Sequence, residues 1–269
     1  MQIAMPRPFI LAAVLLVAAC SSQSDTLLTG RPSITTARVA LAGGSGDIAL
    51  NICNGLLEQR PTDTDLLVCR GDALVVLGRN AEAASVYDRA LALNPRASDA
   101  KIGLGRLRLA TDPTAAELLF LDALTSNPRN AVALNNLGVA RDLLGRHADA
   151  QVAYGEAIAA APDLRGPQVN LALSLGMSGR AGDAVRMLRP IGERADATPR
   201  ERHDLAAVLA MDGKSDEAAR LLRQDMDGPQ ADDAINGFKA LRQSADVACL
   251  IGCRVNTASW VRQAMLGVT

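Results

Sequence analysis

Four prolines recur at nearly constant intervals, and this spacing constrains the fold more than any other feature of the chain. They are Pro61, Pro95, Pro128 and Pro162, which stand 34, 33 and 34 residues apart. An alanine precedes each proline by twelve residues, and a larger residue precedes it by eight: Cys53, Tyr87, Phe120 and Tyr154. Three of the six aromatic residues therefore occupy one repeat position. A period of this length indicates a stack of similar units rather than an irregular bundle.

Small residues mark two further positions of the unit. One is the eighth position of each expected first helix: Ala37, Gly71, Gly105, Gly138, Ala172 and Ala206. The other is the turn expected between the two helices: Gly43 to Gly46, Gly78, Asp112-Pro113, Gly145, Gly179 and Gly213. Small residues let two helices approach closely, the larger residue is expected to fill the gap between hairpins, and proline ends the second helix. Aromatic residues make up only 2% of the chain, which favours helices over sheets.

Two segments carry the pattern most clearly, LLVCRGDALVVLGRNAEAASVYDRALALNP (Leu66 to Pro95) and ALNNLGVARDLLGRHADAQVAYGEAIAAAP (Ala133 to Pro162). They resemble the tetratricopeptide repeat, although the tryptophan that the family carries at its fourth position is absent. The resemblance implies an all-α superhelix of about five to six helical hairpins over residues 33–228. Because the ends of such a stack need a cap, we expect residues 229–269 to provide one, with a helix over Ala231 to Gln243.

The N-terminal segment has the character of an export signal. Arg7 precedes an apolar stretch, Phe9 to Val17, which is too short to span a bilayer as a helix. The following Val-Ala-Ala-Cys20 resembles the bacterial lipobox, which implies cleavage after residue 19 and a lipid on Cys20. Residues 20–32 are polar and are expected to form a flexible tether. In Gram-negative lipoproteins a serine after the cysteine, here Ser21, implies the periplasmic face of the outer membrane. An ordinary secretory signal with a chance cysteine is the alternative.

Four cysteines follow the lipobox: Cys53, Cys69, Cys249 and Cys253. Export to an oxidising compartment favours disulfides, and three pairings are possible in principle. Pairing of nearest neighbours, Cys53 with Cys69 and Cys249 with Cys253, is the simplest hypothesis. The alternative for Cys53 is a buried free thiol at the position that other repeats give to an aromatic residue.

The chain offers little material for catalysis or for metal binding. Its two histidines, His147 and His203, belong to no zinc-binding motif and are expected to be exposed on helices. The Gly43–Gly46 stretch lacks the Lys-Ser/Thr of a phosphate-binding loop and is expected to be a turn. The net charge of −1 gives no indication of a nucleic-acid partner. We therefore expect no enzymatic activity, no cofactor, no metal and no small-molecule substrate.

The repeat resemblance implies that partners bind on the concave face, which the first helices line. The positions that point there in the family are occupied by Arg106, Asn135, Asn136, Val139, Asp142, Leu143, Val169, Asn170, Leu173 and Met177. Asn136 and Asn170 share the sixth position of their helices. Because an amide can both donate and accept hydrogen bonds, this pair could hold the backbone of an extended peptide. The alternative is that both side chains bond local groups or face water.

Lipobox, tether and repeats together resemble the TadD family, the repeat lipoproteins of Flp-type (tight adherence) pilus assembly. That resemblance implies a protein-interaction scaffold on the outer membrane, with the pilus secretin or another assembly component as its partner and the lipid as its membrane contact. Two other binding roles stay open: a pilotin-like lipoprotein of type IV pili or type II secretion, and a general adaptor of envelope biogenesis. A self-associating structural subunit is an alternative of a different class.

Overall fold

We analysed a computed structural model, which describes residues 32–243. Every regular element in this range is a helix, and the all-α architecture expected from the sequence is confirmed. Cys20, Cys249, Cys253, the signal segment, most of the tether and residues 244–269 lie outside the described residues. The helices in chain order are α1 (Ile34–Ala42), α2 (Gly46–Gln59), α3 (Thr64–Val76), α4 (Asn80–Leu93), α5 (Ser98–Arg108), α6 (Pro113–Ser126), α7 (Ala131–Leu143), α8 (His147–Ala160), α9 (Arg165–Met177), α10 (Ala181–Gly192), α11 (Pro199–Met211), α12 (Ser215–Leu222) and α13 (Gly228–Gln243).

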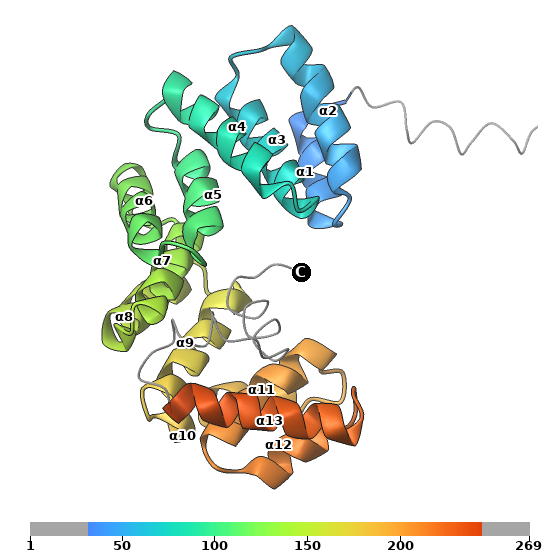
Figure 1. The fold of residues 1–269 in the computed structure, drawn as a ribbon, viewed down its shortest axis with the longest axis vertical. Helices are drawn as coiled ribbons and strands as arrows, with labels where there is room; N and C mark the ends of the chain where they lie inside the picture. The colour runs from blue at the N-terminus through green and yellow to red at the C-terminus, as the bar shows by residue number, and fades with distance from the viewer. Residues whose placement is uncertain (1–31, 244–269) are drawn as a thin grey trace, which may run out of the picture.

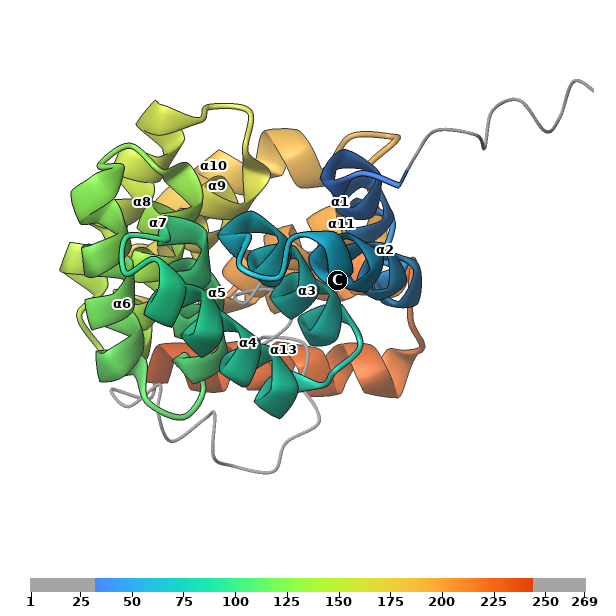
Figure 2. The same cartoon turned by 90° about the horizontal axis from the view of Figure 1, so that it is seen from above.

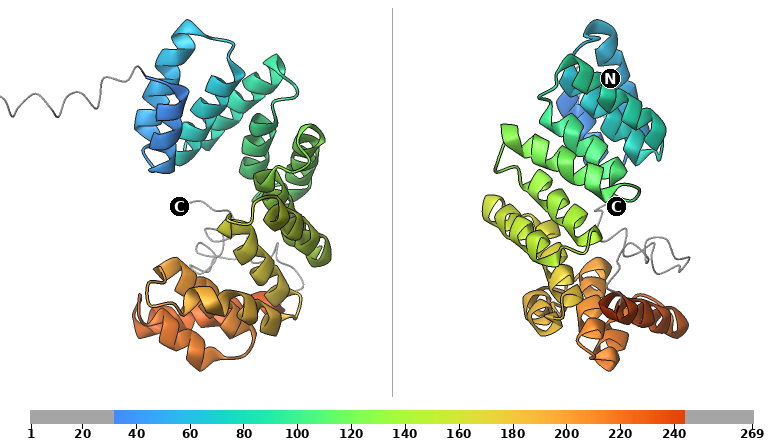
Figure 3. Two further views of the ribbon diagram at one scale, coloured as in Figure 1. Left: turned by 180° about the vertical axis from the view of Figure 1, so that it is seen from behind. Right: turned by 60° about the vertical axis from the view of Figure 1, so that its left-hand side comes forward.

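The helices pair into six consecutive hairpins, from α1–α2 to α11–α12, followed by α13. Figure 3 shows the hairpins stacked one on the next, and Figure 1 shows that the stack curves into an open arc. Each first helix also contacts the first helix of the next hairpin, from α1 with α3 to α9 with α11. In Figure 1, α5, α7 and α9 accordingly lie on the inner side of the arc, and α6 and α8 lie outside them. The first helices therefore line the concave side.

The turns inside the hairpins fall where the glycines predicted them. Gly44, Gly78, Gly145, Gly179 and Gly213 all have positive φ, between 71° and 86°, a conformation that glycine adopts without steric cost. The third hairpin lacks such a glycine. There the Asp112 side chain caps α6 by accepting a 2.9 Å hydrogen bond from the backbone N–H of Ala115.

An aromatic ring packs directly on a glycine in each of the second, third and fourth hairpins. A Cβ atom on Gly71 would lie 2.4 Å from Cε1 of Tyr87, and one on Gly138 would lie 2.4 Å from Cε1 of Tyr154. On Gly105 it would lie 2.6 Å from Cε1 of Phe120. Each pair joins the eighth position of the first helix to the larger residue of the second helix. The ring thus occupies the space that a side chain at the eighth position would need.

The other three hairpins carry the reverse combination of residue sizes at the same two positions. They place alanine on the first helix and a smaller residue on the second: Ala37 with Cys53, Ala172 with Leu188 and Ala206 with Leu222. Glycine therefore accompanies an aromatic ring and alanine accompanies leucine, two combinations of similar total volume. The alanine–cysteine pair of the first hairpin is smaller. The expectation that the larger residue fills the gap between hairpins is incomplete, because each ring first fills a gap inside its own hairpin. Tyr87 does both, since it also packs on Gly103 of the next first helix.

The first hairpin uses its cysteine where later hairpins use a ring. Cys53 in α2 is fully buried, and the structure joins it by a disulfide to Cys69 in α3, with the two Cα atoms 6.3 Å apart. This bridge connects consecutive hairpins across their interface, together with the buried Ala49 and Ala73. Its formation in an oxidising compartment stays a prediction, as does the pairing of Cys249 with Cys253, which lie outside the described residues.

The stack of hairpins ends against α13, which packs on α9, α11 and α12. Ala231, Ile235 and Phe238 on its inner face are buried at 0%, 5% and 3% exposure. In Figure 2, α13 extends along one edge of the arc as a single long helix. The helix begins at Gly228, three residues before the expected start, because Pro229 is tolerated in the first turn. Within the described residues no helix has the length and apolar character needed to cross a bilayer.

The packing of Tyr154 on Gly138 predicts a specific effect of substitution. Gly138→Ala should lower the free energy of unfolding by about 1–3 kcal/mol, because the new methyl group overlaps the ring. The double variant Gly138→Ala with Tyr154→Leu should recover much of this loss, because it recreates the pairs Ala172–Leu188 and Ala206–Leu222. Urea unfolding followed by circular dichroism measures both variants.

The matched control for this substitution is Gly155→Ala, a glycine inside α8 whose added Cβ would meet no atom within 4 Å. It should stabilise the chain by about 0.5–1 kcal/mol through helix propensity. Equal destabilisation by the two alanine substitutions would contradict the packing argument.

Candidate functional site

The structure divides the residues expected on the concave side into two groups. Val139 and Asp142 are 0% exposed, and Leu143, Leu173 and Met177 join the apolar core. Asp142 forms hydrogen bonds inside the fold, and the four apolar side chains pack in the core, so these residues support the first helices. The remaining group reaches or borders the concave side: Arg106, Asn135, Asn136, Val169 and Asn170. Arg106 is exposed, Asn135 and Val169 are half-buried, and the other two are buried with polar atoms left over.

Asp142 is the centre of a completed hydrogen-bond network. Its carboxylate accepts hydrogen bonds from the hydroxyls of Tyr154 at 2.9 Å and Ser174 at 2.8 Å, and Nδ1 of His147 lies 2.8 Å from it. Burial raises the pKa of Asp142, and the bonds from His147, Ser174 and Tyr154 oppose this rise. The expectation that His147 is exposed was wrong, because its side chain packs on Asp142 and is only 19% exposed. The network ties α7 to α8 and α9.

A similar pair forms two hairpins earlier. The hydroxyl of Tyr87 donates a 2.7 Å hydrogen bond to Asp72, whose pKa is raised by burial. The charge of Arg106, on the first helix of the next hairpin, acts to lower the Asp72 pKa. Burial and the neighbouring Asp72 raise the pKa of the Tyr87 hydroxyl, so it stays protonated and remains a donor.

The sixth position of three consecutive first helices presents incompletely bonded polar side chains. These residues are Asn136 in α7, Asn170 in α9 and Asp204 in α11, spaced 34 residues apart. They are 6%, 3% and 3% exposed. Asn170 donates a 2.9 Å hydrogen bond to Asn135, but its own Oδ1 has no partner, and the same is true of Nδ2 of Asn136 and Oδ1 of Asp204. We call these three residues the position-six ladder.

Unsatisfied atoms of this kind are costly and uncommon inside proteins. A buried polar group without a partner costs about 1–3 kcal/mol, and most buried groups are therefore bonded. Three such atoms stand at one repeat position, on helices that line the concave side. The sequence showed two of the three residues. Extending the asparagine spacing by another 34 residues reaches Asp204, which the sequence reasoning missed.

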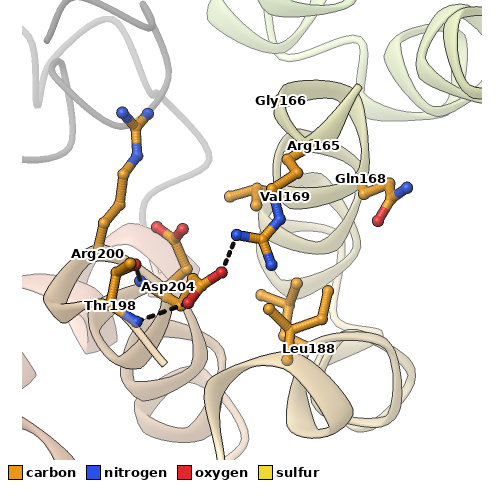
Figure 4. Close-up of a pocket in the computed structure, with 10 residues that line it drawn as sticks. Arg165, Gly166, Gln168, Val169, Leu188, Thr198, Arg200 and Asp204 are labelled. Atoms are coloured by element: carbon orange, nitrogen blue, oxygen red, sulfur yellow. Dashed lines mark hydrogen bonds and ion pairs between the residues drawn. The ribbon is translucent and has the colours of Figure 1, made fainter. Parts of the chain in front are cut away.

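Asp204 borders a cavity of about 310 Å³ between α9, α10 and the start of α11. Val169, Leu188 and Ile191 give the cavity an apolar side, and Arg165, Gln168, Thr198 and Glu201 give it a polar one. Figure 4 shows the labelled residues converging from the neighbouring helices. The Arg165 side chain forms an ion pair with Glu201. The cavity therefore combines apolar contact surface with a buried carboxyl group.

Glu201 is the acid of this cavity that has positively charged partners. It forms an ion pair with Arg165, lies 3.7 Å from Arg194, and accepts a 2.6 Å hydrogen bond from the backbone N–H of Thr198. Thr198 in turn caps α11 by accepting from the backbone N–H of Glu201, which completes a capping box. Glu201 thus holds the start of α11 and places Asp204 one turn further along the helix.

Asp204 has the opposite electrostatic character. Burial raises its pKa to about 6, and the charges of Arg200 and Arg165 only partly counteract this rise. Near neutral pH the residue is therefore largely ionised in a site that solvates the charge poorly. A carboxyl with a raised pKa that borders a cavity is a candidate functional group.

The second histidine is also less exposed than the sequence predicted. The side chain of His203 is 12% exposed, and its Nε2 lies 3.4 Å from Asp225. Burial lowers the pKa of His203, while Asp225 acts to raise it. Among residues 32–243, no three His, Cys, Asp or Glu side chains lie together in a way that could hold a metal ion.

The raised pKa of Asp204 predicts a pH-dependent cost to stability. Between about pH 4 and pH 6 the folded chain holds a proton that the unfolded chain has released, so this carboxyl lowers stability as pH rises through that window. Asp204→Asn should therefore raise the free energy of unfolding at neutral pH by about 1–3 kcal/mol, with little gain near pH 4. Urea unfolding at a series of pH values measures the difference. Asp88→Asn, at an exposed carboxyl on α4, is the control and should change the free energy of unfolding little at neutral pH.

Sequence families described as tetratricopeptide repeats match this chain at residues 70–112, at 119–152, and at 166–190 with 200–224. These segments fall within the hairpins from α3–α4 to α11–α12 and the turns that join them. None of the matching families is a catalytic one. A comparison with curated protein sequences gave no match.

Solved structures with the same fold share little sequence with this chain. TTC0263, a tetratricopeptide-repeat protein of Thermus thermophilus, is 23% identical, with a TM-score of 0.59 over 66% of this chain and 97% of that one. PilW, described as a widely conserved type IV pilus biogenesis factor, is 18% identical, with a TM-score of 0.62 over 71% and 89%. A repeat protein from Parabacteroides merdae is 16% identical, with a TM-score of 0.57 over 78% and 83%. The repeat matches and the hairpin geometry show that the described helices form a tetratricopeptide-repeat array, a fold that these solved structures share.

Proposed function

We propose that this repeat scaffold binds an extended segment of a partner protein along the concave side of α7, α9 and α11. The position-six ladder carries the proposal, because it leaves one donor and two acceptors unsatisfied at intervals of one repeat. An extended peptide presents N–H and C=O groups along its length and could satisfy such a series. Arg106 and Val169 border the same side and would contact the partner's side chains.

We propose further that the scaffold is lipid-anchored at Cys20 to the periplasmic face of the outer membrane and assists Flp-type pilus assembly, with the secretin as its partner. The lipobox-like segment and the repeat array support this role. The likeness to PilW is a likeness of fold, and it makes type IV pilus biogenesis the second candidate. Purifying the anchored chain from its native host and identifying which secretin accompanies it distinguishes the two systems.

The ladder is tested by removing its two amides. Asn136→Ala with Asn170→Ala should reduce recovery of the secretin in pull-downs by about tenfold or more, because two hydrogen bonds to the partner are lost. Helicity measured by circular dichroism should be unchanged. The matched control is Asn51→Ala with Asn80→Ala, two exposed asparagines on the second helices α2 and α4. Undiminished recovery with the ladder variant would contradict the proposed binding mode.

Anchoring is tested separately at Cys20. Cys20→Ala should move the chain from the membrane fraction to the soluble fraction and abolish incorporation of radiolabelled palmitate. Cys249→Ala is the control and should leave both properties unchanged. Membrane association that survives the Cys20 substitution would show that a lipid on this residue is not the anchor.

A further inference from the structure

We propose that the cavity beside Asp204 receives a lysine or arginine side chain of the bound segment, with the Asp204 carboxylate as its counter-ion. The inference rests on the proposed function, because the same segment must first lie along the position-six ladder. It adds a chemical requirement that the ladder alone does not impose. The partner segment must carry a positive charge one repeat beyond the residues that contact Asn170.

The group that lacks a partner in this cavity is an acceptor. Asp204 is 3% exposed, and its Oδ1 has no hydrogen-bond partner. Neither neighbouring arginine supplies one. Arg165 forms its ion pair with Glu201, and in Figure 4 the Arg200 side chain extends away from the Asp204 carboxylate. A donor from outside the chain would complete the site.

A cationic donor fits better than a neutral one. A buried carboxylate that accepts a hydrogen bond from a neutral group would keep an uncompensated charge, whereas an ammonium or guanidinium group neutralises it. The apolar side of the cavity, formed by Val169, Leu188 and Ile191, suits the methylene stem of lysine or arginine. A volume of about 310 Å³ is large enough for one such side chain.

An acidic side chain is a poorer occupant. Arg165, the cation that reaches across the cavity, is already paired with Glu201. An incoming carboxylate would therefore compete with Glu201 and would approach Asp204, a group of the same charge.

Among residues 32–243, three charged side chains besides Asp204 line the cavity. Arg165 lies on α9, and Arg200 and Glu201 lie on α11 itself. Both arginines lower the Asp204 pKa through their charge. The residues that α10 contributes to the cavity, Leu188 and Ile191, carry no charge, and none of its lining residues comes from α12 or α13. Pairing with a cation should lower the Asp204 pKa below its value of about 6 in the free chain, so binding should release protons at mildly acidic pH.

Selection from a random peptide library tests the occupant directly. The full chain in detergent micelles is immobilised and used to select phage-displayed peptides, in parallel with Asp204→Asn, with Asn136→Ala plus Asn170→Ala, and with the control Asp88→Asn. We expect the wild-type chain and Asp88→Asn to enrich peptides with lysine or arginine at one fixed position. Asp204→Asn should lose this basic preference and keep the rest of the motif. The double asparagine variant should lose the motif altogether.

The outcomes separate the two proposals. Two results would refute the cationic occupant and leave the proposed binding mode intact. In the first, the enriched peptides depend on both asparagines but carry no fixed basic residue. In the second, the Asp204→Asn chain still selects the basic residue. No enriched motif, or one that ignores the asparagines, would refute the peptide-binding ladder and the inference that rests on it.

The selected peptide gives a second measurement. Its affinity, followed by fluorescence anisotropy of a labelled copy, should be about tenfold weaker at pH 5 than at pH 7.5, because protonation of Asp204 removes the counter-ion. The Asp204→Asn chain, and a peptide with norleucine in place of its basic residue, should both lose this dependence. An affinity for the wild-type chain that does not change with pH would contradict the ion pair.

Discussion

The packing of an aromatic ring on a glycine determines how closely the two helices of a hairpin can approach. Where the eighth position is glycine, a ring from the second helix lies against the backbone of the first, as Tyr154 does on Gly138. Where it is alanine, leucine or cysteine takes the place of the ring. Because protein interiors are close-packed, glycine with a ring or alanine with leucine fills the hairpin, whereas alanine with a ring would overlap. Each hairpin of the stack therefore depends on a matched pair of residues at these two positions.

The same contact explains why carboxylates lie inside the array. A tyrosine ring that crosses its hairpin carries its hydroxyl to the first helix, where a buried donor needs an acceptor. Asp72 serves Tyr87, and Asp142 serves Tyr154. Phe120 has no hydroxyl and imposes no such requirement. The network around Asp142 also engages Ser174 of the next first helix, so a packing choice inside one hairpin extends to the interface between two.

The sequence predicted the features that follow from the repeat period alone. The structure has every expected turn between helices, because each unit has either a glycine or the pair Asp112-Pro113 at a fixed place. The pairing of glycine with aromatic residues was also readable, since it needs only two positions per repeat to be compared. The burial of His147 could not be predicted from the repeat period. It depends on the contact of His147 with Asp142, which is itself buried against α8 and α9. Asp204 was missed because the sixth position was compared between two repeats and not extended to the third. The cavity beside it depends on how α9, α10 and α11 meet, which no periodic pattern encodes.

Asp142 and Asp204 show how a supporting carboxylate differs from one available to a partner. Both are buried on first helices, and burial raises the pKa of both. The carboxylate of Asp142 has partners from three side chains on α8 and α9, so its charge is compensated inside the fold. Oδ1 of Asp204 has none and borders a cavity. An apolar residue at this position would pack without that desolvation cost, so stacking alone gives no reason for a carboxyl group there. The Asp204 carboxylate destabilises the free chain, and a bound cation would remove this cost. Binding on the concave side would therefore depend on the partner's charge. Shape alone, which every hairpin of this array offers in nearly the same form, would not provide that selectivity.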